Sequence, residues 1–482
     1  MNRRTALGVI AFGGAATLVT ARFALIRSRA EREPAIRVPR FDVPLKIPAV
    51  LEPSRRTATQ DDYDIVQSEA DQEILPGHVT KIWGYQGVFP GPTIRVRSGH
   101  AAVVHQTNRL SVHTVTHVHG GRTPADSDGF ATDMVMPGET RTYKYPNQQR
   151  ASTLWYHDHA MDRTGENVYR GLAGFYIVED DEELSLPLPK GDCDVPLVLQ
   201  DRRFNMDGSL MYDTFGHEGI QGDIMLVNGV PWPRMEVSTR KYRFRILNGS
   251  NARPFQLALS NGDPLIVIGT DGGLLAEPVA VRNLPLAMAE RAEVVVDFSR
   301  VPVGSKIFLM NTRERPERQQ LMRFDVTHRE SDNASVPSRL SDPGFLSRPA
   351  SVNTRTWALQ RSFSMRHGLP PFVWTINGKH FDPDRSDAKV PLGEIELWRL
   401  RNEGAGQQLH PAHVHLAHFQ IVERNGKPPL AHEKGWKDTV ALEDGEEALV
   451  MIRFEQFRGR YMLHCHNLEH EDHAMMSRFD VV

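Results

Sequence analysis

Residues 461–466 read YMLHCH, a short apolar strand that ends in His464, Cys465 and His466. Two earlier stretches have a similar final strand, LWYHDH at 154–159 and IFLMNT at 307–312. Upstream of each final strand lies a strand that ends in asparagine, followed by a second short strand. These pairs are QTNRL and THVHG, ILNGS and PFQLAL, and LRNEG and PAHVHL. Short strands divided by glycine, proline and asparagine turns are typical of β-sandwiches, so we predict one sandwich repeated three times.

The repeat predicts how the chain is divided. The predicted segments are an export signal or N-terminal anchor at 1–27, an extended arm at 28–49, a first sandwich at 50–182, a middle sandwich at 188–328, a linker at 329–349 and a third sandwich at 350–482. The linker is polar and contains proline, serine and arginine, a composition that is typical of a connection between folded units.

The composition is that of an ordinary soluble protein with several domains. Of the 482 residues, 40% are hydrophobic and 24% are charged, and the chain is too long for one hydrophobic core. The formal net charge is −3, and lysine and arginine form no stripe, so we expect no nucleic-acid partner. We also expect the protein to be a monomer.

The N-terminus has the pattern of an export signal. Arg3 and Arg4 precede an uncharged, mostly apolar run that ends at Ala21. Paired arginines before such a run indicate the twin-arginine type of signal, and the length of the run also allows an uncleaved membrane anchor. We therefore expect an extracytoplasmic protein, which is periplasmic, secreted or anchored facing outward.

Histidines are concentrated on the predicted strands. The chain has 21 histidines, and ten of them fall in four groups. The groups are His117/His119, His157/His159, His410/His413/His415 and His464/His466/His470. Residues i and i+2 of a strand point to the same face, so each His-x-His presents two imidazoles together. Imidazole binds copper, zinc and iron, so these groups at matched places of a repeat predict metal sites.

The middle sandwich lacks such ligands. At the corresponding positions it has Phe255, Gln256, Leu257, Met310 and Asn311, which are side chains that pack or pair. We therefore predict that the middle sandwich is a structural spacer.

Cys465 narrows the choice of metal. It lies between His464 and His466 but points to the opposite face of the strand, which predicts two metal sites back to back. A thiolate with two imidazoles and a weak thioether forms a blue-copper centre. The candidates for the other ligands are His410, His470 and Met475. Zinc is the main alternative, but a structural zinc site takes only four ligands, fewer than this chain offers.

The second cysteine does not share these features. Cys193 lies in the polar stretch GDCD without ligand-type neighbours, which predicts a structural thiol. Two cysteines exclude a dense disulfide framework, although one bridge between Cys193 and Cys465 stays conceivable.

Four motifs resemble the copper motifs of the three-domain multicopper oxidases, in the family's order. They are THVHG, WYHDH, HPAHVH and HCHNLEHEDHAM. The stretches GYQGVFPGPTIRV, TLWYHDHAMDRTGENVYRGLAGFYIV and DIMLVNGVPWPRMEV are similar to the branch with the bacterial spore-coat laccases and bilirubin oxidases. The resemblance extends from about residue 80 to the C-terminus. It implies an all-β fold of three tandem cupredoxin-like Greek-key β-sandwich domains.

The resemblance also implies the ligands of four copper ions. The type 1 copper would take His410, Cys465 and His470 with Met475 axial, the type 2 copper His117 and His413, and the type 3 pair His119, His157, His159, His415, His464 and His466. Asp128 and Glu471 match acids that deliver protons to oxygen. The implied reaction is oxidation of a donor at the type 1 copper, electron transfer through Cys465, and reduction of dioxygen to water at the trinuclear cluster.

The electron donor is the open question. Some relatives oxidise metal ions through methionine-rich inserts, and the 16 methionines here form none. A laccase-like preference for phenols and aromatic amines is therefore favoured over oxidation of cuprous, ferrous or manganous ions. A copper-less interaction protein of the same fold would have substitutions in the four motifs, and this chain has none. For Asp438, in GWKDT, deprotonation of substrate near the mouth and a turn role both stay open.

Overall fold

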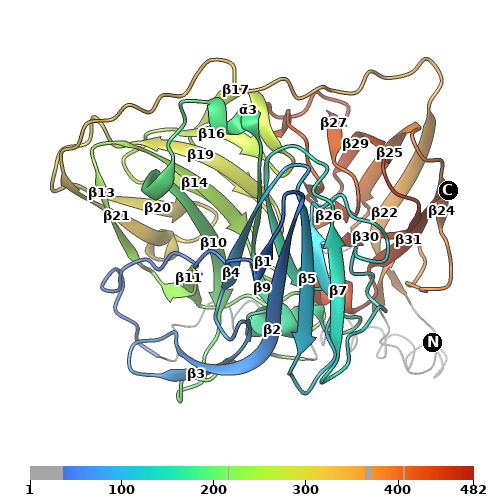
Figure 1. The fold of residues 1–482 in the computed structure, drawn as a ribbon, viewed down its shortest axis with the longest axis horizontal. Coiled ribbons are helices and arrows are strands. Elements are labelled where there is room, and N and C mark those ends of the chain that lie inside the picture. The colour runs from blue at the N-terminus through green and yellow to red at the C-terminus, as the bar shows by residue number, and fades with distance from the viewer. Residues whose placement is uncertain (1–35, 215, 364–371, 405–407) are drawn as a thin grey trace, which may run out of the picture.

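The structure is a computed structural model that describes residues 36–214, 216–363, 372–404 and 408–482. Figure 1 shows a molecule built mainly of strands, gathered in three groups along the chain. Six sheets form these groups, two in each, which confirms the predicted all-β fold. The predicted signal or anchor at 1–27 lies outside the described residues. Among the residues that are described, no helix has the length and apolar character needed to cross a membrane.

The first sandwich combines a sheet of order β1-β2-β5-β7, in which β3 also pairs with β2, with a sheet of order β4-β9-β8-β6. Its strands are β1 (Arg55–Arg56), β2 (Gln60–Glu73), β3 (Val79–Tyr85), β4 (Gly91–Arg97), β5 (Ala101–Asn108), β6 (Thr116–His119), β7 (Thr140–Tyr145), β8 (Ser152–Asp158) and β9 (Ala173–Glu179). The helix α2 (Thr164–Arg170) joins β8 to β9, and α3 (Asp181–Ser185) follows β9.

The middle sandwich has sheets of order β12-β11-β10-β14-β19-β16-β17 and β13-β21-β20-β15-β18. Its strands are β10 (Asp194–Arg202), β11 (Ile224–Val227), β12 (Val230–Pro231), β13 (Arg234–Ser238), β14 (Lys241–Asn248), β15 (Phe255–Leu259), β16 (Leu265–Thr270), β17 (Gly273–Val281), β18 (Leu284–Leu286), β19 (Arg291–Asp297), β20 (Lys306–Asn311) and β21 (Gln320–His328). The single turns of 3-10 helix are η1 (Gly191–Cys193) and η2 (Pro316–Arg318).

The third sandwich has sheets of order β23-β22-β25-β29-β27 and β24-β31-β30-β26-β28. Its elements are β22 (Asn353–Phe363), β23 (Phe372–Ile376), β24 (Ala388–Val390), β25 (Ile395–Asn402), β26 (His410–Val414), β27 (Phe419–Arg424), η3 (Ala431–Glu433), β28 (Thr439–Leu442), β29 (Glu447–Arg453), β30 (Gly459–Cys465), α4 (Leu468–Asp472) and β31 (Met476–Val481). The domain boundaries drawn from the sequence stay predictions.

The repeated asparagines have one structural role. Asn108, Asn248 and Asn402 each end a strand that runs parallel to its neighbour. Each side-chain amide donates to one backbone carbonyl of the connection that follows and to a second carbonyl further along the chain, which for Asn108 are those of Val112 and Val135. A buried backbone carbonyl needs a partner, so asparagine at this point fixes the loop that leads to the next strand.

The arm and the linker both pack against the middle sandwich. Phe41 donates its backbone N–H to the carbonyl of Trp232 at 2.8 Å, and Leu45 donates to that of Arg234 at 2.7 Å. In the linker, Leu340 is buried and donates to the carbonyl of Ala276. Side-chain hydrogen bonds also join the three sandwiches to one another, pair by pair. The histidine-bearing strands of the first and third sandwiches face each other as a result.

Candidate metal centre

Two strand pairs carry the histidines. In the first sandwich β6 and β8 are antiparallel, with His117 opposite His157 and His119 opposite Trp155. In the third sandwich β26 and β30 are antiparallel, with His413 opposite His464. Because side chains alternate along a strand, each of these strand pairs presents its imidazoles on one face of its sheet.

These faces meet at the boundary between the first and third sandwiches. The rings of His117 and His415 stack with centroids 3.9 Å apart, and those of His119 and His413 stack at 3.6 Å. Eight histidines gather here, and each is 1% exposed or less: His117, His119, His157, His159, His413, His415, His464 and His466. Their ligand atoms form three groups that are each within 4.8 Å: His117/His413/His415, His119/His157/His466 and His159/His415/His464.

The nitrogen atoms of these rings fit metal ions. Nε2 of His117, His157 and His413 has no hydrogen-bond partner, although a buried polar atom normally has one. In each case Nδ1 faces a backbone carbonyl and donates to it. Burial also lowers the pKa of these three imidazoles well below the usual value, which favours the neutral form that binds metals. The donor set therefore suits copper, with carbonyls fixing each tautomer.

A second group of donors lies on the other face of β30. Sγ of Cys465 is 3.4 Å from Nδ1 of His410 and 3.6 Å from Nδ1 of His470, and the two nitrogens are 3.2 Å apart. Burial raises the pKa of the Cys465 thiol well above its usual value, so loss of its proton requires a bound cation. Cys193 and Cys465 are both free and buried, which excludes the bridge between them.

Met475 is buried beside this group. Its backbone N–H donates to the carbonyl of His470 at 3.0 Å, and its carbonyl accepts the N–H of Cys465 at 3.1 Å. The backbone thus brings the predicted axial residue to the site, and the role of its sulfur stays a prediction.

The two predicted acids lie against the histidine cluster. Asp128 accepts from Nδ1 of His415 at 2.8 Å, and Oε2 of Glu471 is 3.1 Å from Nδ1 of His464. Both carboxyls are buried. Burial raises the pKa of Asp128, whereas at Glu471 the imidazoles of His159 and His464 outweigh burial and hold the pKa below its usual range. Their role in proton delivery stays a prediction.

The sequence did not predict the contacts that three residues make at these sites. Asp438 is fully buried and accepts from Nε2 of His119 at 3.0 Å, so it does not lie at the mouth of a substrate site. Arg291 of the middle sandwich is paired with it. Trp374 lies over His470 with ring centroids 4.0 Å apart. A lone aspartate, arginine or tryptophan has no spacing that marks it, so only the fold reveals these contacts.

Comparison with known proteins agrees with this geometry. Residues 68–183, 209–329 and 354–482 each match a family model described as multicopper oxidase. The chain is 36% identical to a laccase of Bacillus subtilis, over 91% of this chain and 97% of the laccase. It is 38% identical to a bilirubin oxidase of Albifimbria verrucaria, over 92% of this chain and 81% of that protein. A solved laccase structure from Pediococcus acidilactici superposes with a TM-score of 0.86 at 32% identity, covering 94% and 96% of the two chains.

The fold and the histidine cluster define a copper oxidoreductase of three cupredoxin-like domains. The chain belongs to the multicopper oxidase family, as its motifs predicted. Enzymes of this family bind four copper ions and use dioxygen as the electron acceptor. The alternative of a copper-less interaction protein is therefore set aside.

Proposed function

We propose that this multicopper oxidase takes electrons from phenols and aromatic amines and reduces dioxygen to water. Bound copper supplies the one-electron redox chemistry and the affinity for dioxygen. The residues that would hold it are His410, Cys465, His470 and Met475 (type 1), His117 and His413 (type 2), and His119, His157, His159, His415, His464 and His466 (type 3). The observation that carries the proposal is the position of Cys465 between His464 and His466, on one strand that serves both donor groups.

The strand gives a short covalent path between the two groups. Cys465 faces His410 and His470, while its bonded neighbours His464 and His466 face the histidine cluster. The strand is held by β26 on one side and β31 on the other. One peptide bond on each side of Cys465 separates it from His464 and His466. The donor group around Cys465 and the histidine cluster are therefore at a fixed separation, which suits electron transfer without motion of the protein.

Two acids are placed to handle the protons that water formation consumes. Asp128 holds its carboxylate against Nδ1 of His415, and Glu471 holds its own against Nδ1 of His464. They approach the cluster from different sandwiches, the first and the third. We propose that each passes protons to reduced oxygen, as a positioned carboxyl can.

The surface near His470 suits an aromatic donor. Phe372 is 43% exposed and Phe363 is 65% exposed, and their rings contact edge to face at 5.7 Å. The guanidinium of Arg361 lies over both Phe372 and Trp374. Trp374 in turn covers His470. Exposed rings beside a redox ligand can stack with a phenol, whereas a hydrated metal ion gains little from them.

The first test uses the wild-type protein loaded with copper. We expect an intense blue absorption, four copper ions per chain and oxygen uptake with a phenolic dye. A colourless protein that stays copper-free after loading would overturn the assignment. Faster oxygen uptake with cuprous, ferrous or manganous ions than with phenols, at matched concentrations, would overturn the choice of donor.

The aromatic surface gives a second test of the donor. Phe372→Ala should raise KM for bulky phenols several-fold and leave KM for ferrous ions unchanged, because only the phenol loses a stacking partner. The matched control is Phe345→Ala, since Phe345 is similarly exposed (42%) but packs against Trp436. Equal effects of the two substitutions, or no effect of either, would contradict the proposed surface.

We also propose that the chain acts outside the cytoplasm. The support is Arg3 and Arg4 before the apolar run of the N-terminus. Replacing both arginines with lysine should leave the enzyme in the cytoplasmic fraction. Unchanged export of that variant would contradict a twin-arginine signal.

A further inference from the structure

The middle sandwich reaches the copper site through one arginine. Arg291 begins β19 and is buried, and its five N–H donors all have acceptors. Nε donates to the carbonyl of Thr153 in the first sandwich at 2.9 Å. Nη1 and Nη2 donate to Oδ1 and Oδ2 of Asp438 in the third sandwich, at 2.8 and 2.5 Å. The carbonyls of Ala289 and Asp271 take the remaining two. One guanidinium therefore joins all three sandwiches.

Asp438 extends this contact to two histidines of the cluster. Its Oδ1 accepts the Nε2–H of His119 at 3.0 Å, and its backbone carbonyl accepts the Nδ1–H of His413 at 2.9 Å. Those two rings are the stacked pair that bridges the first and third sandwiches. The hydroxyl of Thr439 also donates to Oδ1 at 2.9 Å, so the carboxylate has a full set of partners.

His119 differs from five of the other cluster histidines in the nitrogen that it leaves free, whereas His159 and His466 also leave Nδ1 without a partner. Five cluster histidines have Nδ1 hydrogen-bonded and Nε2 directed at the cluster: His117, His157, His413, His415 and His464. In His119 the carboxylate of Asp438 takes Nε2, and Nδ1 is the atom without a partner. The proton on a neutral imidazole is placed by the hydrogen bond of its other nitrogen, so Asp438 selects the Nδ1 lone pair as the ligand.

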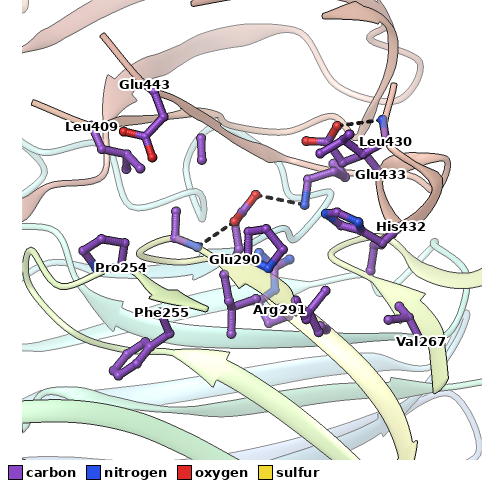
Figure 2. Close-up of a pocket in the computed structure, with 18 of the residues that line it drawn as sticks. Pro254, Phe255, Val267, Glu290, Arg291, Leu409, Leu430, His432, Glu433 and Glu443 are labelled. Carbon is purple, nitrogen blue, oxygen red and sulfur yellow. Dashed lines mark hydrogen bonds and ion pairs between the residues drawn. The ribbon is translucent and has the colours of Figure 1, made fainter. Parts of the chain in front are cut away.

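The surroundings keep Asp438 in place. Asp271 accepts the backbone N–H of Asp438 at 3.3 Å and that of Arg291 at 2.8 Å. It also pairs with Lys437 at 2.9 Å, and Lys437 pairs with Glu290 at 3.2 Å. Glu290 and Arg291 line a cavity of about 210 Å³ between the middle and third sandwiches. Figure 2 shows both side chains, with dashed lines at the carboxylate of Glu290. This carboxylate accepts the backbone N–H of Ala287 and pairs with Lys437.

The ion pair between Arg291 and Asp438 explains the glycine of the THVHG motif. Gly120 has a φ of +83°, and a Cβ on it would lie 2.6 Å from Oδ2 of Asp438 and 2.7 Å from Nη2 of Arg291. A side chain at this position would displace the ion pair. The residue after His119 is thus restricted by a contact to the middle sandwich.

We propose that Arg291 of the middle sandwich is a positioning residue for the trinuclear copper cluster, acting through Asp438 to fix the His119 ring with Nδ1 toward copper. This inference rests on the proposed ligand set and goes beyond the spacer role predicted for the middle sandwich. A lysine in place of Arg291 keeps the charge but cannot hold both carboxylate oxygens and three carbonyls at once.

The test compares three variants, each loaded with copper. Arg291→Lys and Asp438→Asn should keep the blue absorption of the type 1 site and lose the near-ultraviolet absorption of the oxidised type 3 pair. Copper held by the pair should be released about 10- to 100-fold more readily, the range typical for lost partners of ligating histidines. The matched control is Arg253→Lys, because Arg253 is a buried arginine of the same sandwich that pairs with Asp201 and Glu314.

Each outcome decides the inference. Unchanged near-ultraviolet absorption and copper retention in both Arg291→Lys and Asp438→Asn would overturn it. Parallel loss of the blue and near-ultraviolet absorptions, with the same fall in Tm as in Arg253→Lys, would show that Arg291 only stabilises the fold. A wild-type chain that binds no copper would overturn the proposed function as well, which separates that failure from the failure of this inference alone.

Discussion

Replacing Glu471 with glutamine should slow oxygen reduction without removing copper. The carboxyl is 1% exposed, so water cannot readily take its place, and Oε2 is 3.1 Å from Nδ1 of His464. Glutamine keeps the size and one oxygen acceptor but cannot hold or release a proton. A positioned acid contributes about 10²- to 10⁴-fold, and Asp128 on the other side of the cluster should compensate in part. We therefore expect kcat to fall by about 10²- to 10³-fold, or about 3–4 kcal/mol.

The assay is steady-state oxygen uptake with a phenolic donor, together with copper analysis of the same sample. The matched control is Glu469→Gln on the same helix, because Glu469 is also buried but accepts from Tyr212, Ile220 and Asn251. The control should keep kcat within about threefold of wild type. A Glu471→Gln variant that retains its copper and turns over as fast as the control would refute the role of Glu471 in proton delivery.

Three further changes test other parts of the site. Cys465→Ser should abolish the blue absorption, reduce copper from four to three ions per chain and stop donor oxidation, and metal analysis with four ions retained would contradict this. Trp374→Ala should lower the free energy of unfolding by about 3–5 kcal/mol in a denaturant titration, because a side chain only 4% exposed is lost, and a change below about 1 kcal/mol would count against it. Burial, with Arg122 adding to it, lowers the pKa of His418 to about 3. In the unfolded chain the His418 imidazole takes up a proton near pH 6.5, whereas in the folded chain it stays neutral. The free energy of unfolding therefore falls as the pH drops below this value. His418→Gln should make the loss of unfolding free energy between pH 7 and pH 5 about 2 kcal/mol smaller than in wild type, and equal losses in the two proteins would contradict the assignment.

The candidate ligands could be singled out in the sequence because a copper site built on strands has a local pattern. His117 and His119, or His464 and His466, face the same way by strand geometry alone, so a short stretch of sequence already contains half of a site. The repeat then placed these stretches at equivalent strands of the first and third sandwiches. The fold gathers these histidines at one boundary, and their division among the copper ions stays a prediction.

The contacts around the ligands could not be predicted in this way. Arg291 lies 147 residues from Asp438 in the chain, and an ion pair between such distant segments has no period and no spacing. Trp374 looks like any aromatic residue of a buried strand, and only the tertiary structure places it over His470. The sequence offered two roles for Asp438, and its position argues against the role at the mouth, because its carboxylate faces His119 and not the solvent.

The arrangement of charge explains why three sandwiches are needed for a site whose ligands come from two. The boundary between the first and third sandwiches holds buried imidazoles with nitrogens that have no partner within the protein, and burying such atoms costs free energy. That boundary alone would gain from separating and hydrating the rings. Arg291 opposes this, because its donors tie Thr153 and Asp438 to the middle sandwich at the same point. A buried ion pair contributes little net stability, but breaking one leaves a charge without a partner. The proposed role of Arg291 therefore gives the middle sandwich a part in holding the two histidine faces together, and bound copper would add stability at the same boundary.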